Sequence, residues 1–198
     1  IITTTTDSIT LFTSAGNKII LNQLSFYHAA TTVGVGLLFS AAAVVTLSGR
    51  CVVYKCSQGI ISTGAGTTVL AGNTSVGGCN LFGILAAGAG YASGLIGVTN
   101  GCIYNLYGEV NSVLQFNYYG IFGGITSGMY AETNSFCRTI TSAFYGCLAG
   151  TVYATIATKM VVVGSEFSDN AGTVITALSG SYININGVSG SPSLNLTV

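Results

Sequence analysis

Charged residues are scarce in this sequence. Five Lys and Arg and five Asp and Glu among 198 residues give a net charge of zero and a charged fraction of 5%, against about 25% in ordinary soluble domains. Five scattered cations cannot form a phosphate-binding stripe, so nucleic acid is excluded as a partner. Disorder is excluded too, because 49% of the residues are apolar. A near-neutral surface protects poorly against self-association, so we expect other chains to cover much of it.

Residues that favour helices are nearly absent as well. Glu, Lys, Arg, Gln and Met are few, which argues against a helical bundle. Thr, Ser, Val, Ile, Tyr and Asn dominate instead, interrupted by 28 glycines. This composition predicts an all-β protein made of many short strands separated by turns.

Cysteines and glycines recur with a period of 23 or slightly more. Cys56, Cys79 and Cys102 are evenly spaced, and a glycine that opens an apolar stretch follows each of them, at Gly59, Gly83 and Gly108. Such a period is typical of a solenoid. We therefore expect parallel β-structure over residues 36–190, with turns of about 23–26 residues and these three glycines at equivalent corners. The rhythm departs at residues 109–118, which indicates an enlarged turn or a lateral insertion.

The six cysteines allow two interpretations. An even number is compatible with three disulfides in a secreted protein. Alternatively they are reduced and buried, with Cys56, Cys79 and Cys102 stacked as an interior ladder, and this is favoured because three equivalent thiols can form only one pair. A zinc site needs Cys or His at short spacing, and His28 is the single histidine. No metal or cofactor is predicted: Gly64-Ala-Gly66 and Gly88-Ala-Gly90 repeat with the turns and precede no expected helix.

Residues 29–47 contain no charge and are long enough to cross a bilayer. They are rich in Gly, Thr and Ser, and no Lys/Arg asymmetry flanks them. A pair of buried strands divided at Ser40 explains the segment as well, and we expect no membrane insertion.

Two regions are predicted along the chain. Residues 1–35 form an N-terminal cap or the end of a preceding segment, and residues 36–198 form the solenoid domain. The sequence starts with Ile-Ile-Thr-Thr, without Met or a signal peptide, which favours a fragment of a longer polypeptide.

Several turn sequences carry a family resemblance. Tyr119-Gly-Ile, Met129-Tyr-Ala, Tyr145-Gly-Cys-Leu-Ala and the run Ser179-Gly-Ser-Tyr-Ile-Asn-Ile-Asn-Gly-Val-Ser-Gly-Ser resemble turns of the right-handed parallel β-helix in phage tail fibres and tailspikes, over roughly residues 36–191. The resemblance implies a right-handed parallel β-helix, a homotrimer, an extracellular location in the virion tail beside other tail proteins, and recognition of a host cell-surface glycan. Members that cleave polysaccharide carry acidic residues in a groove, and no motif here maps onto such a site.

Carboxylates are too few to make catalysis the leading hypothesis. A glycosidase needs two of them about 5–10 Å apart, and the best pair is Glu109 and Glu132, 23 residues apart. Counted from Gly108 and Gly120, they fall at different phases of the repeat. A structural, host-surface-binding module without catalysis is therefore expected. A polysaccharide-degrading tailspike and a bacterial solenoid adhesin or ice-binding protein are the alternatives.

Aromatic residues offer the predicted ligand contacts. Eleven Tyr and nine Phe occur without any Trp, and most Phe are expected in the core. Exposed tyrosines such as Tyr118 and Tyr119 are expected to stack on sugars or to fill a subunit interface.

Overall fold

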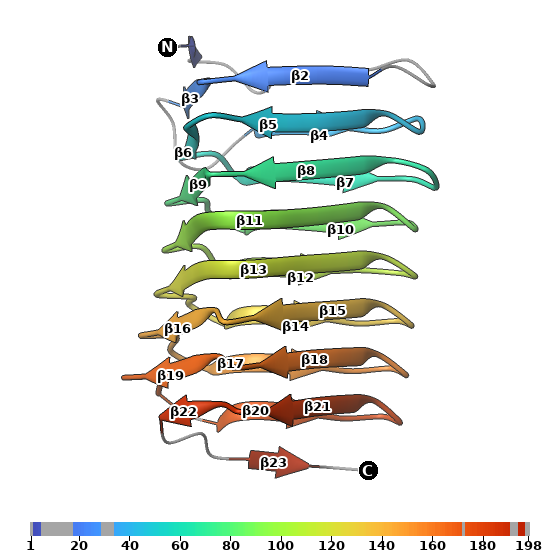
Figure 1. Cartoon of the computed structure of the whole chain (residues 1–198), viewed down its shortest axis with the longest axis vertical. Coiled ribbons are helices and arrows are strands. Elements are labelled where there is room, and N and C mark those ends of the chain that lie inside the picture. The colour runs from blue at the N-terminus through green and yellow to red at the C-terminus, as the bar shows by residue number, and fades with distance from the viewer. Residues whose placement is uncertain (1, 5–17, 29–33, 172, 191–193, 197–198) are drawn as a thin grey trace.

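The computed structural model describes residues 2–4, 18–28, 34–171, 173–190 and 194–196. These form a parallel β-solenoid of about seven turns, with strands perpendicular to the long axis (Figure 1). The chain crosses the near face of Figure 1 toward the left, returns behind and descends with each turn, which makes the helix right-handed. The predicted fold class is confirmed.

Each complete turn contributes one strand to an 8-stranded sheet. Its strands are β4 (Val35–Phe39), β7 (Gln58–Thr63), β10 (Phe82–Ala87), β12 (Tyr104–Gly108), β14 (Ser127–Ala131), β17 (Gly150–Ala154), β20 (Thr173–Ala177) and β23 (Leu194–Leu196). All neighbours in this sheet pair in parallel, as one strand per turn requires.

A 15-stranded sheet has two arms that meet in the ten-residue strands β11 (Tyr91–Asn100) and β13 (Val113–Phe122). The arm that faces the viewer in Figure 1 contains, besides the first halves of these strands, β2 (Lys18–Asn22), β5 (Val44–Ser48), β8 (Thr68–Gly72), β15 (Phe136–Ile140), β18 (Lys159–Val163) and β21 (Tyr182–Asn186). The other arm contains, besides the second halves, β1 (Ile2–Thr4), β3 (Ser25–His28), β6 (Cys51–Tyr54), β9 (Thr74–Gly77), β16 (Ala143–Tyr145), β19 (Glu166–Ser168) and β22 (Ser189–Gly190). We call them the front arm and the side arm.

The register is regular from β4 onward. Paired positions in the 8-stranded sheet lie 22 to 24 residues apart along the series Leu37, Ile60, Ile84, Leu106, Met129, Val152 and Ile175. Residues 109–118 are accommodated within this spacing, so the predicted enlarged turn or insertion is wrong. Glycines suggested it because they do not mark one fixed position of the turn.

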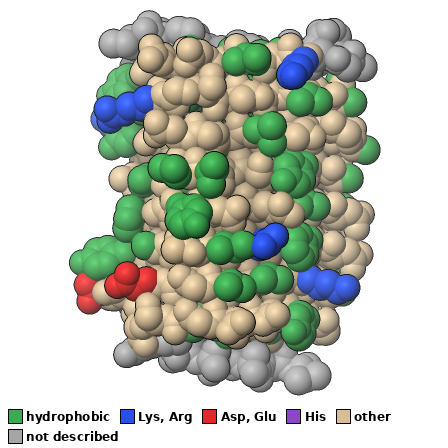
Figure 2. All heavy atoms as spheres, in the orientation of Figure 1, with side chains coloured by type: hydrophobic (Ala, Val, Ile, Leu, Met, Phe, Trp, Pro, Cys, Tyr) green, Lys and Arg blue, Asp and Glu red, His purple; other side chains and the backbone are tan. Residues whose placement is uncertain are grey.

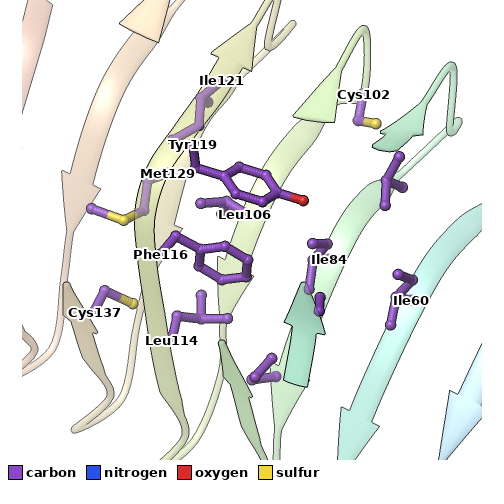
Figure 3. Close-up of a cluster of buried hydrophobic side chains, with 14 of the residues drawn as sticks. Ile60, Ile84, Cys102, Leu106, Leu114, Phe116, Tyr119, Ile121, Met129 and Cys137 are labelled. Atoms are coloured by element: carbon purple, nitrogen blue, oxygen red, sulfur yellow. The ribbon is translucent and has the colours of Figure 1, made fainter. Parts of the chain in front are cut away.

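The interior is filled by apolar side chains that repeat from turn to turn. Leu37, Ile60, Ile84, Leu106 and Met129 from the 8-stranded sheet are completely buried. They pack in one continuous cluster with inward side chains of both arms, among them Leu114, Phe116 and Ile121 of β13 (Figure 3). Burial of this ladder on every turn is the main stabilising contribution to the fold.

The predicted cysteine ladder is present in the interior. Cys56, Cys79 and Cys102 occupy equivalent positions just before β7, β10 and β12, where Asn80 N donates to Cys56 O and Ile125 N donates to Cys102 O. All six cysteines are buried and free, so the interior placement of these three is confirmed. Burial raises the pKa of Cys56 and Cys147 to about 11, because the thiolate loses its hydration.

The glycines that follow these cysteines do not lie at corners, contrary to the sequence prediction. Gly59 and Gly83 are buried within β7 and β10, facing each other across neighbouring turns, and Gly108 pairs instead with Ala86 and Ala131. A Cβ at Gly59 would overlap the carbonyl oxygen of Gly83 and lie 3.1 Å from the Cys79 sulfur. Close packing of turns, and not a positive φ, explains glycine at positions 59 and 83.

The solenoid pattern extends into the predicted N-terminal cap. β2 pairs in parallel with β5, and β3 with β6, as in later turns. Residues 5–17 and 29–33 of the predicted cap lie outside the described residues, so the division between residues 1–35 and 36–198 stays a prediction. In the apolar stretch 29–47, β4 and β5 confirm the interpretation as two strands divided at Ser40. Among the described residues no helix is long and apolar enough to cross a bilayer.

Replacing Gly59 by Ala should destabilise the solenoid by about 1–3 kcal/mol, because the clash involves backbone that cannot move aside. Gly72→Ala in β8 is the matched control. A Cβ there meets only Leu47 O at 3.5 Å, so the free energy of unfolding should stay equal or rise by about 0.5–1 kcal/mol. Denaturant unfolding of the two variants measures both effects, and equal stabilities would contradict the close packing of turns.

Candidate functional site

A column of stacked tyrosines lies on the outer face of the 8-stranded sheet. Tyr107, Tyr130 and Tyr153 occupy paired positions of β12, β14 and β17. The ring centroids of Tyr107 and Tyr130 are 5.1 Å apart with an interplanar angle of 4°, and those of Tyr130 and Tyr153 are 5.0 Å apart at 6°. In-register strands place equivalent residues about 4.8 Å apart, so identical aromatic residues stack face to face along the axis. We call these three residues the tyrosine column.

A second aromatic column beside it is shorter. Phe82 and Tyr104 occupy paired positions of β10 and β12, with ring centroids 5.8 Å apart, and Tyr104 meets Tyr130 edge-on at 5.2 Å. On the next two turns this position is held by Ser127 and Gly150. Rings therefore give way to small residues while the tyrosine column continues.

This loss of rings leaves a hollow of about 470 Å³ beside Tyr130 and Tyr153, a volume within the usual range for small-ligand pockets. It is lined by Thr126, Ser127, Tyr130, Ala149, Gly150, Tyr153, Thr176 and Leu178. The tyrosine column also ends at its border, because Thr176 pairs with Tyr153 where the next ring would stand. The hollow thus offers aromatic surface and hydroxyl groups, and no charged side chain among the described residues lines it.

Glu109 and Glu132 lie on consecutive turns at the same position of the repeat. Gly108 pairs with Ala131, and Glu132 N donates to Gly108 O. The prediction that the two carboxylates fall at different phases is therefore wrong, because it was counted from glycines at unequal positions. The Tyr107 hydroxyl donates a 2.8 Å hydrogen bond to Glu132 Oε1, which ties this pair to the tyrosine column.

Neighbouring turns of a parallel sheet lie about 4.8 Å apart, a spacing comparable with the roughly 5–5.5 Å between the two carboxyl groups of a retaining glycosidase. Neither Glu109 nor Glu132 lines the hollow, however. A general acid must reach the bond that it protonates, so cleavage of a sugar in the hollow would require one of these carboxylates to reach into it.

The carboxylate of Glu132 also helps to raise the pKa of two tyrosine hydroxyls of the column. Burial, followed by the hydrogen bond to Glu132, raises the pKa of Tyr107 well above its ordinary value. Burial and the negative charge of Glu132 raise the pKa of Tyr130 to about 12. Both hydroxyls therefore stay protonated at any physiological pH, and the single O–H of Tyr107 is taken up by its hydrogen bond to Glu132.

The two tyrosines predicted to bind a ligand, Tyr118 and Tyr119, have side chains that point to opposite sides of the chain. Tyr119 is 1% exposed, and its hydroxyl donates a 3.0 Å hydrogen bond to Thr74 O inside the solenoid (Figure 3). Tyr118 is 59% exposed because its backbone adopts φ = 53° at the corner within β13 and turns the side chain outward. Stacking on a sugar stays a prediction for Tyr118, whereas Tyr119 packs in the core.

Sequence reasoning missed the tyrosine column, although a signal for it exists. Tyr107, Tyr130 and Tyr153 are spaced by 23 residues, as Cys56, Cys79 and Cys102 are. Counting positions in the repeat from the glycines hid this match, because the glycines do not mark one fixed position of the turn.

No group of three or more His, Cys, Asp or Glu side chains within the described ranges could hold a metal ion. No family model matches the chain, and neither does any curated protein or solved structure.

Ionisation of Tyr130 in the tyrosine column should destabilise the fold at alkaline pH. The folded pKa of Tyr130, about 12, exceeds the ordinary value of about 10, so its contribution to stability is complete below pH 10 and is lost as the pH rises toward 12. A difference absorbance titration between the wild-type protein and Tyr130→Phe should show one phenol that ionises near pH 12. A difference curve centred at pH 10 would contradict the burial of this hydroxyl.

Proposed function

We propose that the chain is a structural, host-surface-binding module without catalysis, and that the hollow beside Tyr153 binds a neutral glycan. The observation that carries the proposal is the end of the tyrosine column beside the hollow, where Thr176 replaces a ring. Tyrosine combines an apolar ring, which packs against the C–H face of a sugar, with a hydroxyl that hydrogen-bonds to sugar hydroxyls. The uncharged lining suits such a ligand, because no charge has to be desolvated.

The sequence resemblance supports a location for such a module. A right-handed β-helix with turns of this kind would belong to a tail fibre or tailspike, at the surface of a phage virion and beside other tail proteins. There the solenoid would serve as a rigid stem whose side carries the glycan site.

Cleavage of polysaccharide is the second candidate function. The observation in its favour is the position of Glu109 and Glu132 on consecutive turns, since a carboxylate pair at such a spacing is the core of a retaining glycosidase.

Binding is tested with the purified chain and a panel of immobilised bacterial surface polysaccharides. Tyr153→Ala should weaken binding to the recognised polysaccharide about tenfold, which corresponds to the loss of one stacking contact. Tyr182→Ala is the matched control, because Tyr182 is an equally large, 59% exposed tyrosine on the front arm. Equal binding by both variants would remove the hollow as the glycan site.

The same polysaccharides separate binding from cleavage. The double variant Glu109→Gln and Glu132→Gln should bind as the wild-type protein does, and neither should release oligosaccharides. Release by the wild-type protein that disappears in the double variant would establish the glycosidase and refute the proposal.

Association of several copies, as the homotrimer that the resemblance implies, belongs to the same proposal. Ile125 and Leu148 are neighbours on consecutive turns, 51% and 59% exposed. Such an apolar ridge on a nearly uncharged protein favours burial against a second copy.

Native mass spectrometry should therefore give a multiple of 20.1 kDa, and Ile125→Lys with Leu148→Lys should shift the protein toward the monomer, since unpaired charges in an interface are costly. A stable wild-type monomer at micromolar concentration would contradict the association.

A further inference from the structure

The charged residues of the side arm and its corners stand at two ends of the arm. Arg50 and Lys55 flank β6, whereas Glu166 begins β19 and Asp169 follows it, five turns later. The strands between them, β9, β16 and the second halves of β11 and β13, contain no charged residue. Figure 2 shows basic side chains at its upper left edge and acidic ones at its lower left edge. The arm is therefore positive at one end and negative at the other.

A column of glycines joins the two charged ends. The corner that follows the side arm has a positive φ on each of these turns, at 57° for Lys55 and 51° for Asp169. The four turns between them carry glycine at this position, at Gly78, Gly101, Gly123 and Gly146. Because glycine has no side chain, the backbone of this corner is open to close approach by another surface.

The outward residues of the side arm differ in size from turn to turn. One column contains, in order, Tyr54, Gly77, Asn100, Phe122, Tyr145 and Ser168. Laid against itself in the opposite direction, this column places Tyr54 against Ser168, Tyr145 against Gly77, and Phe122 against Asn100. Each aromatic ring then meets a smaller residue, so the column is complementary in size to its own reverse.

The half of the arm with the smaller residues is hollowed. A hollow of about 260 Å³ is lined by Val52, Tyr54, Ser75, Val76, Gly77, Val98 and Asn100. On the other half, Tyr145 is 48% exposed, and its ring meets that of Phe122 edge-on with centroids 6.3 Å apart. The arm thus has a recess on one half and a pair of outward aromatic rings on the other.

We propose that the side arm binds the side arm of a second copy of this chain, with the long axes of the two solenoids antiparallel. The twofold axis passes between the turns of Gly101 and Gly123. Lys55 then meets Asp169 of the second copy, and the rings of Phe122 and Tyr145 enter its hollow. Under the twofold symmetry every contact occurs twice, because the same patch serves both copies.

The charges select the antiparallel arrangement over a parallel one. Parallel copies whose side arms faced a common axis would place Lys55 beside Lys55 and Asp169 beside Asp169, and these like charges repel. The antiparallel pair instead opposes Lys55 to Asp169 and Arg50 to Glu166 at both ends. It differs from the homotrimer that the resemblance implies, and it rests neither on that resemblance nor on the glycan site beside Tyr153.

The contact patch is small, which sets the strength of the pair. Six strands about 4.8 Å apart, each with about four residues rising about 3.3 Å, cover roughly 400 Å² per copy. A stable complex buries about 800 Å² per partner. The pair should therefore be reversible, and salt should weaken it because its end contacts are ionic.

Analytical ultracentrifugation of the full chain measures the pair directly. We expect an equilibrium between one and two copies over about 1 µM to 0.5 mM protein, and a Kd that rises severalfold from about 0.05 to 0.5 M NaCl. Tyr145→Ala should raise Kd about tenfold through loss of a ring that fills the hollow. Tyr182→Ala is the matched control, because Tyr182 is exposed on the front arm, and it should leave Kd unchanged.

Charge reversal tests the orientation. Lys55→Asp and Asp169→Lys should each raise Kd at least about tenfold, since each variant opposes like charges at both ends of the pair. Both substitutions in one chain should restore pairing, because every contact again joins opposite charges. Lys159→Asp makes the same change of charge on the front arm and should have no effect. In a parallel pair the single reversals would replace one repulsion by another and leave Kd unchanged.

A zero-length carbodiimide cross-link identifies the contact. Within one copy Lys55 and Asp169 lie five turns apart, about 24 Å, so an amide bond between them can form only between copies. The proposal would be overturned by a mass of three copies, by a monomer at every concentration, by unchanged Kd in Tyr145→Ala or the single reversals, or by a cross-linked dimer without this linkage. None of these results affects glycan binding beside Tyr153, so the two proposals fail separately.

Discussion

The fold depends on hydrogen bonding between each turn and the turns 22 to 24 residues before and after it. Because every neighbouring pair of strands is parallel and in register, a side chain always meets the residue at the same position of the next turn. Interior columns must therefore consist of groups that pack on their own kind, as the leucine, isoleucine and methionine series of the 8-stranded sheet does. The same constraint builds the tyrosine column outside. The same repeat therefore produces both the apolar core and the tyrosine column of the candidate site.

The sequence predicted the architecture because strand-forming residues and the cysteine period are both one-dimensional signals. Cys56, Cys79 and Cys102 kept their phase because a small apolar group fits the interior of each turn equally well. Gly59 and Gly83 are also in phase, but Gly108 is not, since glycine is used both where backbones approach closely and where φ is positive. Counting from glycines therefore misplaced Glu132, and exposure could not be read for Tyr119, whose neighbour Tyr118 has the same side chain on the opposite side of the corner.

What the sequence could not show is where a column stops. The hollow beside Tyr153 exists because Ser127, Gly150 and Thr176 replace rings at positions whose equivalence becomes visible only from the register. In a solenoid, recognition surfaces arise where the repeat is interrupted, and the chemistry of the interruption decides the ligand.

The described residues that line the hollow beside Tyr153 and the larger hollow on the front arm are all uncharged, and this has a consequence for the environment in which the protein can work. Dissolved ions weaken attraction between charges by screening, and they have little effect on ring contacts and neutral hydrogen bonds. A ligand held only by such contacts would be retained about equally well in fresh water, in a body fluid and in brine. If the protein attaches through such a surface, its poverty of charge would make that attachment tolerant of salinity.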